Sequence, residues 1–253
     1  MKSFLHYIII GMNLDENIGI QQDIFALIPA RIGSKGIIKK NIEKIDNKTL
    51  VAISIEQAKL SIPNDKIYVS TDSPEIMKIA KDLNVNIMIR SENASTDSAT
   101  ADEVVIDFLN FMGFSGNGDI KGGIIVYLQP TSPFRGESLI SNCIKTYLAK
   151  MVPVVTVRQV KDHPLKMLTI NDQMRIQTYS DLASPTSNRQ NFEELHIASG
   201  SVYVFSVNDF ENNYKKIPIV DSIPVIVTNA EKIDIDDTFD LYIAKLIGEC
   251  NEF

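Results

Sequence analysis

The sequence predicts an α/β protein built on a mainly parallel, Rossmann-like sheet with helices on both faces. From residue 23 onward, short apolar runs alternate with amphipathic stretches, and each run has the length of a strand. The run at 24–28 is continuous and apolar and stops at Pro29, as is typical of a strand buried on both faces. Strands separated by helices form parallel βαβ units, so the carboxyl ends of these strands should share one edge of the sheet.

Further elements follow the first strand at the spacing of such units. The pattern predicts helices at 50–60 and 100–112, a helix that starts after Ser73, and strands at 67–69, 86–89 and 124–128. Ser73-Pro74-Glu75 favours a helix start because Ser caps, Pro suits the first helical position and Glu suits the first turn. In the helix at 100–112, apolar residues recur at helical spacing and predict one buried face.

The pattern changes after residue 157. Residues 158 to about 200 hold two short β-like pieces, at 165–170 and 174–179, and then a polar stretch. Because roughly 40 residues rarely sustain their own core, we interpret this segment, with flanks to about residue 215, as an excursion from the sheet. Strands at 202–205 and 225–227 and a final amphipathic helix then complete one domain over 23–253, preceded by an extension at 1–22.

Composition excludes several classes of protein. The net charge of -7 argues against a nucleic-acid-binding protein, which usually presents a basic face. The two cysteines, Cys143 and Cys250, form no CxxC pair and no disulfide framework, which favours a reducing cytoplasm. The three histidines lie far apart, so we expect any metal to be held by carboxylates.

The N-terminus does not predict secretion. Its apolar run at 4–12 is shorter than a secretory core and is followed by polar residues instead of a cleavage site. No other segment reaches the roughly 18 apolar residues of a membrane span. We therefore expect a cytoplasmic protein without a membrane partner.

Chemistry is expected in the loops that follow the strands, because ligands of open parallel sheets bind there. The first loop runs Pro29-Ala30-Arg31-Ile32-Gly33-Ser34-Lys35-Gly36, and Lys39-Lys40-Asn41 follows. Its glycines allow backbone N–H groups to turn toward an anion, and its cations could neutralise a polyphosphate. It is neither a Walker A loop nor a dinucleotide fingerprint, and a solvated turn is the alternative.

Later loops carry further polar residues. Ser70-Thr71-Asp72 follows the second strand and could equally be an ordinary helix cap. Arg90 and Asp97 follow the third strand. In Gln129-Pro130-Thr131-Ser132-Pro133-Phe134-Arg135, two prolines make a stiff loop that could hold Gln129 and Arg135 in fixed directions.

Asp234 and Asp236 stand two apart near the end of the chain. In an extended segment they face the same side, and two adjacent carboxylates favour a cation between them. Mg²⁺ that keeps several waters suits such a pair. The alternative is an acidic turn before the final helix, with Asp237 as the cap.

Together, these motifs match a known family in order and spacing. From residue 23 to about 248, the chain resembles the acylneuraminate cytidylyltransferases, or CMP-sialic acid synthetases. The resemblance implies an enzyme that transfers CMP from CTP to the anomeric hydroxyl of a nine-carbon 3-deoxy-2-keto sugar acid, such as N-acetylneuraminic or legionaminic acid, and releases pyrophosphate.

The resemblance also implies roles for single residues. The residues expected to bind the nucleotide are Arg31, Gly33, Ser34, Lys35, Lys40, Asn41 and Arg90, with Arg31 and Lys35 also catalytic. Those expected near the sugar acid are Gln129, Lys166, Arg189 and Tyr203. Asp234 and Asp236 would bind Mg²⁺ and act in catalysis, and the excursion would help to form a homodimer.

Two positions depart from the family pattern. Ile32 replaces a glycine after the loop arginine, so this position cannot rely on an easy positive φ. Ser199-Gly200 stands where many members have Asn-Gly, which shortens a side chain expected close to the sugar. No histidine is placed as a general base, and the sequence leaves the base open.

Two other functions fit parts of the pattern. A metal-dependent glycosyltransferase also carries an Asp-x-Asp on an α/β nucleotide fold, but that pair commonly follows a strand in the middle of the chain. A regulatory module would bind CTP without turnover. Pyrophosphate release with a keto sugar acid distinguishes the three.

Overall fold

The structure, a computed structural model, describes residues 23–250 except 34–35, 92–93, 95, 97–98, 115–122, 182–185, 189 and 191. The extension at 1–22 and four residues of the predicted motifs therefore lie outside the described residues. These four are Ser34, Lys35, Asp97 and Arg189.

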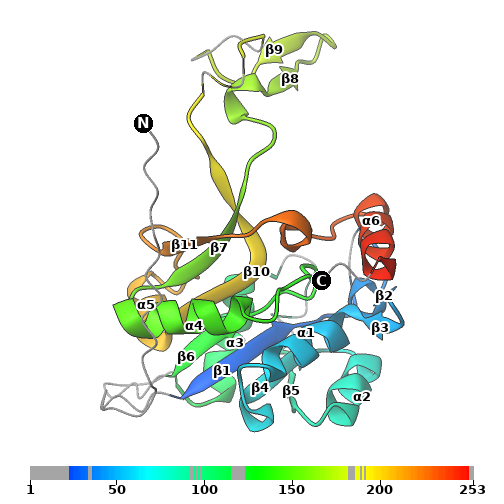
Figure 1. The fold of residues 1–253 in the computed structure, drawn as a ribbon, viewed down its shortest axis with the longest axis vertical. Helices are drawn as coiled ribbons and strands as arrows, with labels where there is room; N and C mark the ends of the chain where they lie inside the picture. Colours follow the sequence, from blue (N-terminus) through cyan, green and yellow to red (C-terminus); the bar gives the residue numbers. More distant parts are fainter. Residues whose placement is uncertain are drawn as a thin grey trace.

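A seven-stranded sheet forms the centre of the molecule (Figure 1). Its order is β11 (Ile223–Ile226), β7 (Val154–Gln159), β10 (His196–Ser206), β6 (Ile124–Tyr127), β1 (Ile24–Pro29), β4 (Ile67–Thr71) and β5 (Asn86–Ile89). The pairs β6–β1, β1–β4, β4–β5 and β7–β11 are parallel, whereas β10 runs antiparallel to β6 and β7. The mainly parallel α/β class predicted from the sequence is confirmed.

Helices cover both faces of this sheet. One buried cluster joins the sheet to α1 (Leu50–Lys59), α2 (Pro74–Asp82) and α4 (Leu139–Lys150). A second cluster on the other face includes α3 (Ala101–Phe111) and α5 (Val207–Asn212). The helix start predicted at Ser73 is confirmed, because the Ser73 hydroxyl accepts from the N–H of Ile76 and Pro74 is the first helical residue.

A third apolar cluster lies apart from the two main cores. It joins Ile37, Phe134 and Ile235 to the hairpin of β2 (Lys44–Ile45) and β3 (Lys48–Thr49) and to α6 (Thr238–Glu249). Each of these three residues comes from a different loop that the sequence singled out. The cluster therefore packs the first loop, the loop after β6 and the acidic segment against one another.

The excursion projects from the sheet (Figure 1). β7 and β10 pair as far as Gln159 and His196, and residues 160–195, which we call the arm, continue beyond them. The arm carries the hairpin of β8 (Leu168–Ile170) and β9 (Ile176–Thr178), whose six residues are all exposed. This hairpin has no core of its own, in keeping with the expected excursion.

Short 3₁₀ turns connect several of these elements. The turns are η1 (Lys40–Ile42), η2 (Asn64–Lys66), η4 (Pro164–Lys166) and η6 (Asn229–Lys232). Among the helices that the structure describes, none has both the length and the apolar character needed to cross a bilayer.

Candidate functional site

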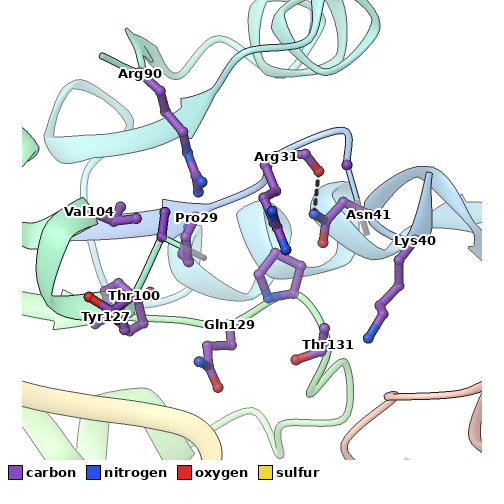
Figure 2. A pocket seen from close by; sticks show the side chains of 14 residues that line it. Pro29, Arg31, Lys40, Asn41, Arg90, Thr100, Val104, Tyr127, Gln129 and Thr131 are labelled. Carbon is purple, nitrogen blue, oxygen red and sulfur yellow. Dashed lines mark hydrogen bonds between the residues drawn. The ribbon is translucent and has the colours of Figure 1, made fainter. Parts of the chain in front are cut away.

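A cavity of about 240 Å³ lies at the carboxyl ends of β1 and β6. Its walls come from the loop after β1, the η1 turn, the start of α3 and the loop after β6 (Figure 2). The predicted site residues that line it are Arg31, Gly33, Lys40, Asn41, Arg90 and Gln129. Residues up to 98 positions apart in the sequence thus gather at one edge of the sheet, where a parallel fold is expected to bind its ligand.

The first loop is held in place by two side chains. Asp72 Oδ1 accepts from the N–H of Ile32 at 2.9 Å, and Asn41 Nδ2 donates to the carbonyl of Arg31 at 2.8 Å. Ser73, not Asp72, caps the following helix, so the Ser70-Thr71-Asp72 motif supports the loop. Positive φ occurs at Lys39 but not at Ile32, so the missing glycine costs this loop no backbone strain.

Arg90 places a buried cation on the cavity wall. Its Nε donates to the carbonyl and the hydroxyl of Ser70, and its Nη1 donates to the carbonyl of Ala94. Burial lowers the pKa of Arg90, because a charged guanidinium loses water there. The Arg90 guanidinium is fixed beside Val104 and Tyr127. A planar, uncharged ligand group could stack against these two side chains and place its polar edge at the guanidinium.

Lys40 connects the first loop to the acidic segment. Its ammonium donates to the carbonyl of Ile235 at 2.6 Å and lies 3.6 Å from Asp236 Oδ1. Gly36 touches the same segment, since a Cβ at Gly36 would collide with the carbonyl oxygen of Asp236. The cationic loop and the two carboxylates therefore form one contiguous surface.

The two carboxylates have different surroundings. Asp234 is half-buried, and the hydroxyls of Thr131 and Ser132 contact it, with Ser132 Oγ 3.4 Å from Asp234 Oδ1. Burial is the main cause that raises the pKa of Asp234; the charge of Asp236 adds to it, while Lys40 and the two hydroxyls oppose it. The Asp236 side chain is 80% exposed. Both carboxylates thus lie beside the loops that line the cavity, and that of Asp236 is open to solvent.

Gly200 lies beside the candidate site, although the sequence indicated it only through the Ser199-Gly200 pair of the family pattern. It has φ of +82° within an irregularity of β10 between Ala198 and Tyr203. A Cβ there would lie 2.6 Å from Gln129 Oε1 and 2.8 Å from Ser132 Oγ. Glycine is required by both the backbone conformation and the close approach of the loop after β6.

Ser199 does not act where the sequence suggested. Its hydroxyl is buried and donates to Thr156 Oγ1 on β7 at 2.8 Å, so it bonds between strands and does not line the cavity. Whether a shorter side chain at this position changes the choice of sugar stays a prediction. Tyr203 is buried with its ring 6.0 Å from that of Tyr127, an edge contact that supports a cavity-lining residue from behind.

Lys166 is not brought to this cavity. It lies in η4 on the arm, where the ribbon has left the sheet (Figure 1). Within one chain, the structure therefore brings six of the predicted site residues to one cavity but leaves Lys166 apart. Arg189 and Lys35 lie outside the described residues.

Comparison with known proteins matches this geometry. A family model described as cytidylyltransferase matches residues 25–233. The chain is 30% identical to N-acylneuraminate cytidylyltransferase of Escherichia coli, over 89% of this chain and 52% of that protein. It is 29% identical to CMP-N,N'-diacetyllegionaminic acid synthase of Legionella pneumophila, over 90% of this chain and 97% of that protein.

A solved structure shares the fold at low sequence identity. It is a CMP:2-keto-3-deoxy-manno-octonic acid synthetase complexed with CTP, with a TM-score of 0.61 and 15% identity. The alignment covers 90% of this chain and 99% of that one. The chain spans about half the length of the Escherichia coli relative and nearly all of the Legionella relative.

Proposed function

Because this chain belongs to the cytidylyltransferase family, we propose that it transfers CMP from CTP to the anomeric hydroxyl of a nine-carbon 3-deoxy-2-keto sugar acid and releases pyrophosphate. The names of its relatives support an acid of the sialic or legionaminic type. The observation that carries the proposal is the juxtaposition of a cationic cavity with Gln129, Asp234 and Asp236 at the same edge of the sheet.

The nucleotide occupies the cavity in this proposal. Arg90 and the start of α3 enclose the cytosine end, and Arg31 faces the phosphates. The anomeric hydroxyl oxygen attacks the α-phosphorus and forms a bond there, the bond to the pyrophosphate oxygen breaks, and the hydroxyl proton leaves to solvent water. Charge spreads over the phosphate oxygens during this step, so fixed cations accelerate it mainly by positioning and electrostatics.

Asp234 and Asp236 fit a Mg²⁺ ion. The pair offers one half-buried and one exposed carboxylate, and Mg²⁺ is commonly held by one or two carboxylates while it keeps several waters. The raised pKa of Asp234 also indicates a carboxylate that gains from a nearby cation. Bound there, Mg²⁺ supplies charge stabilisation for the phosphate oxygens.

The acceptor sugar lies next to Gln129 in this proposal. The missing side chain at Gly200 leaves room for the Gln129 amide beside the hydroxyl of Ser132 and the carboxylate of Asp234. Lys166 and Arg189 are the proposed partners of the carboxylate of the acid, because a buried carboxylate needs a cation. Lys166 lies on the arm, away from the cavity of its own chain, so the partner's arm would have to supply it.

The proposal includes a homodimer. The arm exposes the apolar side chains of Met167, Leu168, Ile170, Met174, Ile176 and Tyr179. Such a patch on a hairpin without a core supports burial against a second copy of the chain. Two free cysteines, one of them buried, support a cytoplasmic protein.

Pyrophosphate release tests the proposed function. Purified protein with CTP and Mg²⁺ should release pyrophosphate only when a 3-deoxy-2-keto sugar acid is added, and a panel of such acids identifies the substrate. CTP binding without release would favour the regulatory module instead. Transfer from an already activated sugar, with no pyrophosphate, would favour the glycosyltransferase.

Paired saturation curves test the acceptor residues. Arg189→Ala should raise KM for the sugar acid far more than KM for CTP, and Lys166→Ala should do the same more weakly because Lys lacks the planar fork. Arg175→Ala, an exposed arginine between β8 and β9, is the matched control and should change neither. Equal effects on both substrates would remove Lys166 and Arg189 from the acceptor pocket.

A further inference from the structure

Arg135 is buried beneath the candidate site and joins three parts of the fold. It is 6% exposed. Its Nε donates to the carbonyl of Ser201 on β10 at 2.9 Å, and its Nη1 donates to Ser54 Oγ and Gln57 Oε1 on α1 at 3.3 and 2.8 Å. Its Nη2 donates to the carbonyl of Gln129 at 2.6 Å.

Each of these partners is uncharged. Among the described residues no carboxylate forms an ion pair with Arg135. Asp234 affects it only by electrostatic attraction at longer range. Burial lowers the pKa of Arg135 to about 9, and the negative charge of Asp234 opposes that shift. A buried cation whose bonds all go to neutral groups is costly for stability, so its retention points to a task other than stability.

The bonds of Arg135 converge on the loop that carries Gln129. Gln57, which accepts from Arg135, also donates from Nε2 to the carbonyl of Pro133 at 2.7 Å. Arg135 and Gln57 therefore hold the loop at Gln129 and at Pro133, on either side of Thr131 and Ser132. The rest of the loop follows these two anchor points.

Gly200 restricts where the side-chain amide of Gln129 can lie. Arg135 binds its backbone carbonyl, while its side-chain Oε1 lies 2.6 Å from where a Cβ of Gly200 would stand. A small shift of the backbone at 129 would thus move the side-chain amide against β10 or away from it. The amide keeps a single position only if Arg135 and Gln57 fix the backbone of the loop.

We propose that Arg135 is a positioning residue, which fixes the side chain of Gln129 for the acceptor sugar without itself touching a substrate. This inference rests on the proposed function in so far as Gln129 contacts the sugar acid. The planar fork of Arg reaches Ser201, Gln57 and Gln129 at once, in three directions, and the single ammonium of Lys does not reproduce it.

Kinetics of a double-mutant cycle test the proposal. Arg135→Lys keeps the charge and should raise KM for the sugar acid about tenfold, with KM for CTP changed less than about twofold. In a Gln129→Ala background the same change should have little further effect on KM for the acid, because Arg135 acts through Gln129. Phe210→Leu, a core change on α5 at the opposite face, controls for lost stability.

A merely structural role gives different results. Arg135→Lys would then change both KM values by similar factors, or would add its full effect to that of Gln129→Ala. Normal KM for the acid in Arg135→Lys would also overturn the proposal.

Hydrogen exchange provides a readout that does not need turnover. Amides of residues 129–136 should exchange at least tenfold faster in Arg135→Lys and Arg135→Met, whereas those of β4 should keep their rates. Unchanged exchange at 129–136 would overturn the proposal even if no acid in the panel is a substrate. Absence of pyrophosphate release by the unaltered protein, in contrast, counts against the proposed function alone.

Discussion

The carboxyl edge of the sheet and the arm are built in opposite ways. At the edge, Lys40, Arg90 and Arg135 are each at least nine-tenths buried and bonded to backbone carbonyls. On the arm, every residue of β8 and β9 is exposed. The described residues of the edge are bonded within one chain, whereas every residue of the hairpin strands on the arm is exposed.

This difference separates two kinds of binding residue. Buried side chains that are bonded to the backbone keep their positions without a ligand, so the cavity proposed to bind the nucleotide is pre-organised. Arm residues gain fixed positions only against another surface. We therefore expect changes at the edge to affect chemistry and nucleotide binding, and changes on the arm to affect assembly and the acceptor.

The largest effect is expected at the acidic segment. Asp234→Asn and Asp236→Asn should each lower kcat at least tenfold, because lost charge stabilisation of about 2–4 kcal/mol is typical for such groups. The unfolding temperature Tm of Asp234→Asn should not fall below that of the unaltered protein. The amide keeps its contacts with Thr131 and Ser132, and the substitution removes a half-buried charge.

Asp82→Asn, an exposed carboxylate on α2, is the control for the loss of one charge and should leave kcat unchanged. The comparison between edge and arm would lose its basis if both acidic-segment variants kept near-normal kcat at low Mg²⁺.

The next effect is expected on the arm. Ile170 and Ile176 face each other across β8 and β9 and are 66% and 70% exposed. Replacing both by Asp should convert the proposed dimer to monomer in sedimentation or light scattering, because two buried charges would be costly at the interface.

Thr169→Asp with Gln177→Asp provides a matched control, since this pair lies on the other face of the same hairpin. It should leave the dimer intact. A monomeric unaltered protein, or equal loss of the dimer in both double variants, would contradict an interface on the isoleucine face.

A smaller effect is expected where Asp72 holds the first loop. Asp72→Ala removes the acceptor of the Ile32 N–H and should raise KM for CTP roughly fivefold, the size of one lost hydrogen bond of about 1 kcal/mol. Asp72→Asn keeps a side-chain oxygen and should recover most of the loss. If the alanine variant binds CTP normally, the loop does not depend on this bond.

The smallest change probes the core without altering activity. Burial raises the pKa of Cys143 to about 12, whereas Cys250 is exposed at the end of α6. Iodoacetamide at pH 8 should label one thiol in the folded protein and two after unfolding, as counted by mass spectrometry. Labelling of both thiols in the folded protein would show that the core under α4 opens readily.

The same pKa sets a direction for stability at high pH. Cys143 ionises near pH 9 in the unfolded chain and near 12 in the folded one, so the unfolded chain releases its proton first. The free energy of unfolding should therefore decrease as pH rises from 9 toward 12, and Cys143→Ala should reduce that slope.

Local patterns in the sequence were enough for most of the elements. The strand at 86–89 matches β5, and the helix expected at 100–112 corresponds to α3 at Ala101–Phe111. Asp237 caps α6, as one reading of the acidic segment suggested. These features depend on residues a few positions apart, whose apolar spacing and capping groups can be recognised directly.

Long-range features were not accessible in the same way. The sequence predicted strands near 202–205 and 225–227 but not that β10 runs antiparallel between β6 and β7. Strand direction depends on which neighbours a strand meets, and the apolar pattern of a buried strand is the same in both directions. The hairpin of β2 and β3 was missed because its strands have two residues each.

By itself, the sequence determined the α/β class, the order of the apolar runs and the kinds of side chain that follow each strand. Only the tertiary structure decided which of them meet. Lys40 binds the carbonyl of Ile235, 195 positions away, and Arg135 supports Gln129 from beneath the site. Such partners are fixed by packing of separate elements, and a hydrogen bond to a distant backbone carbonyl leaves no mark on the sequence, because every residue carries that carbonyl.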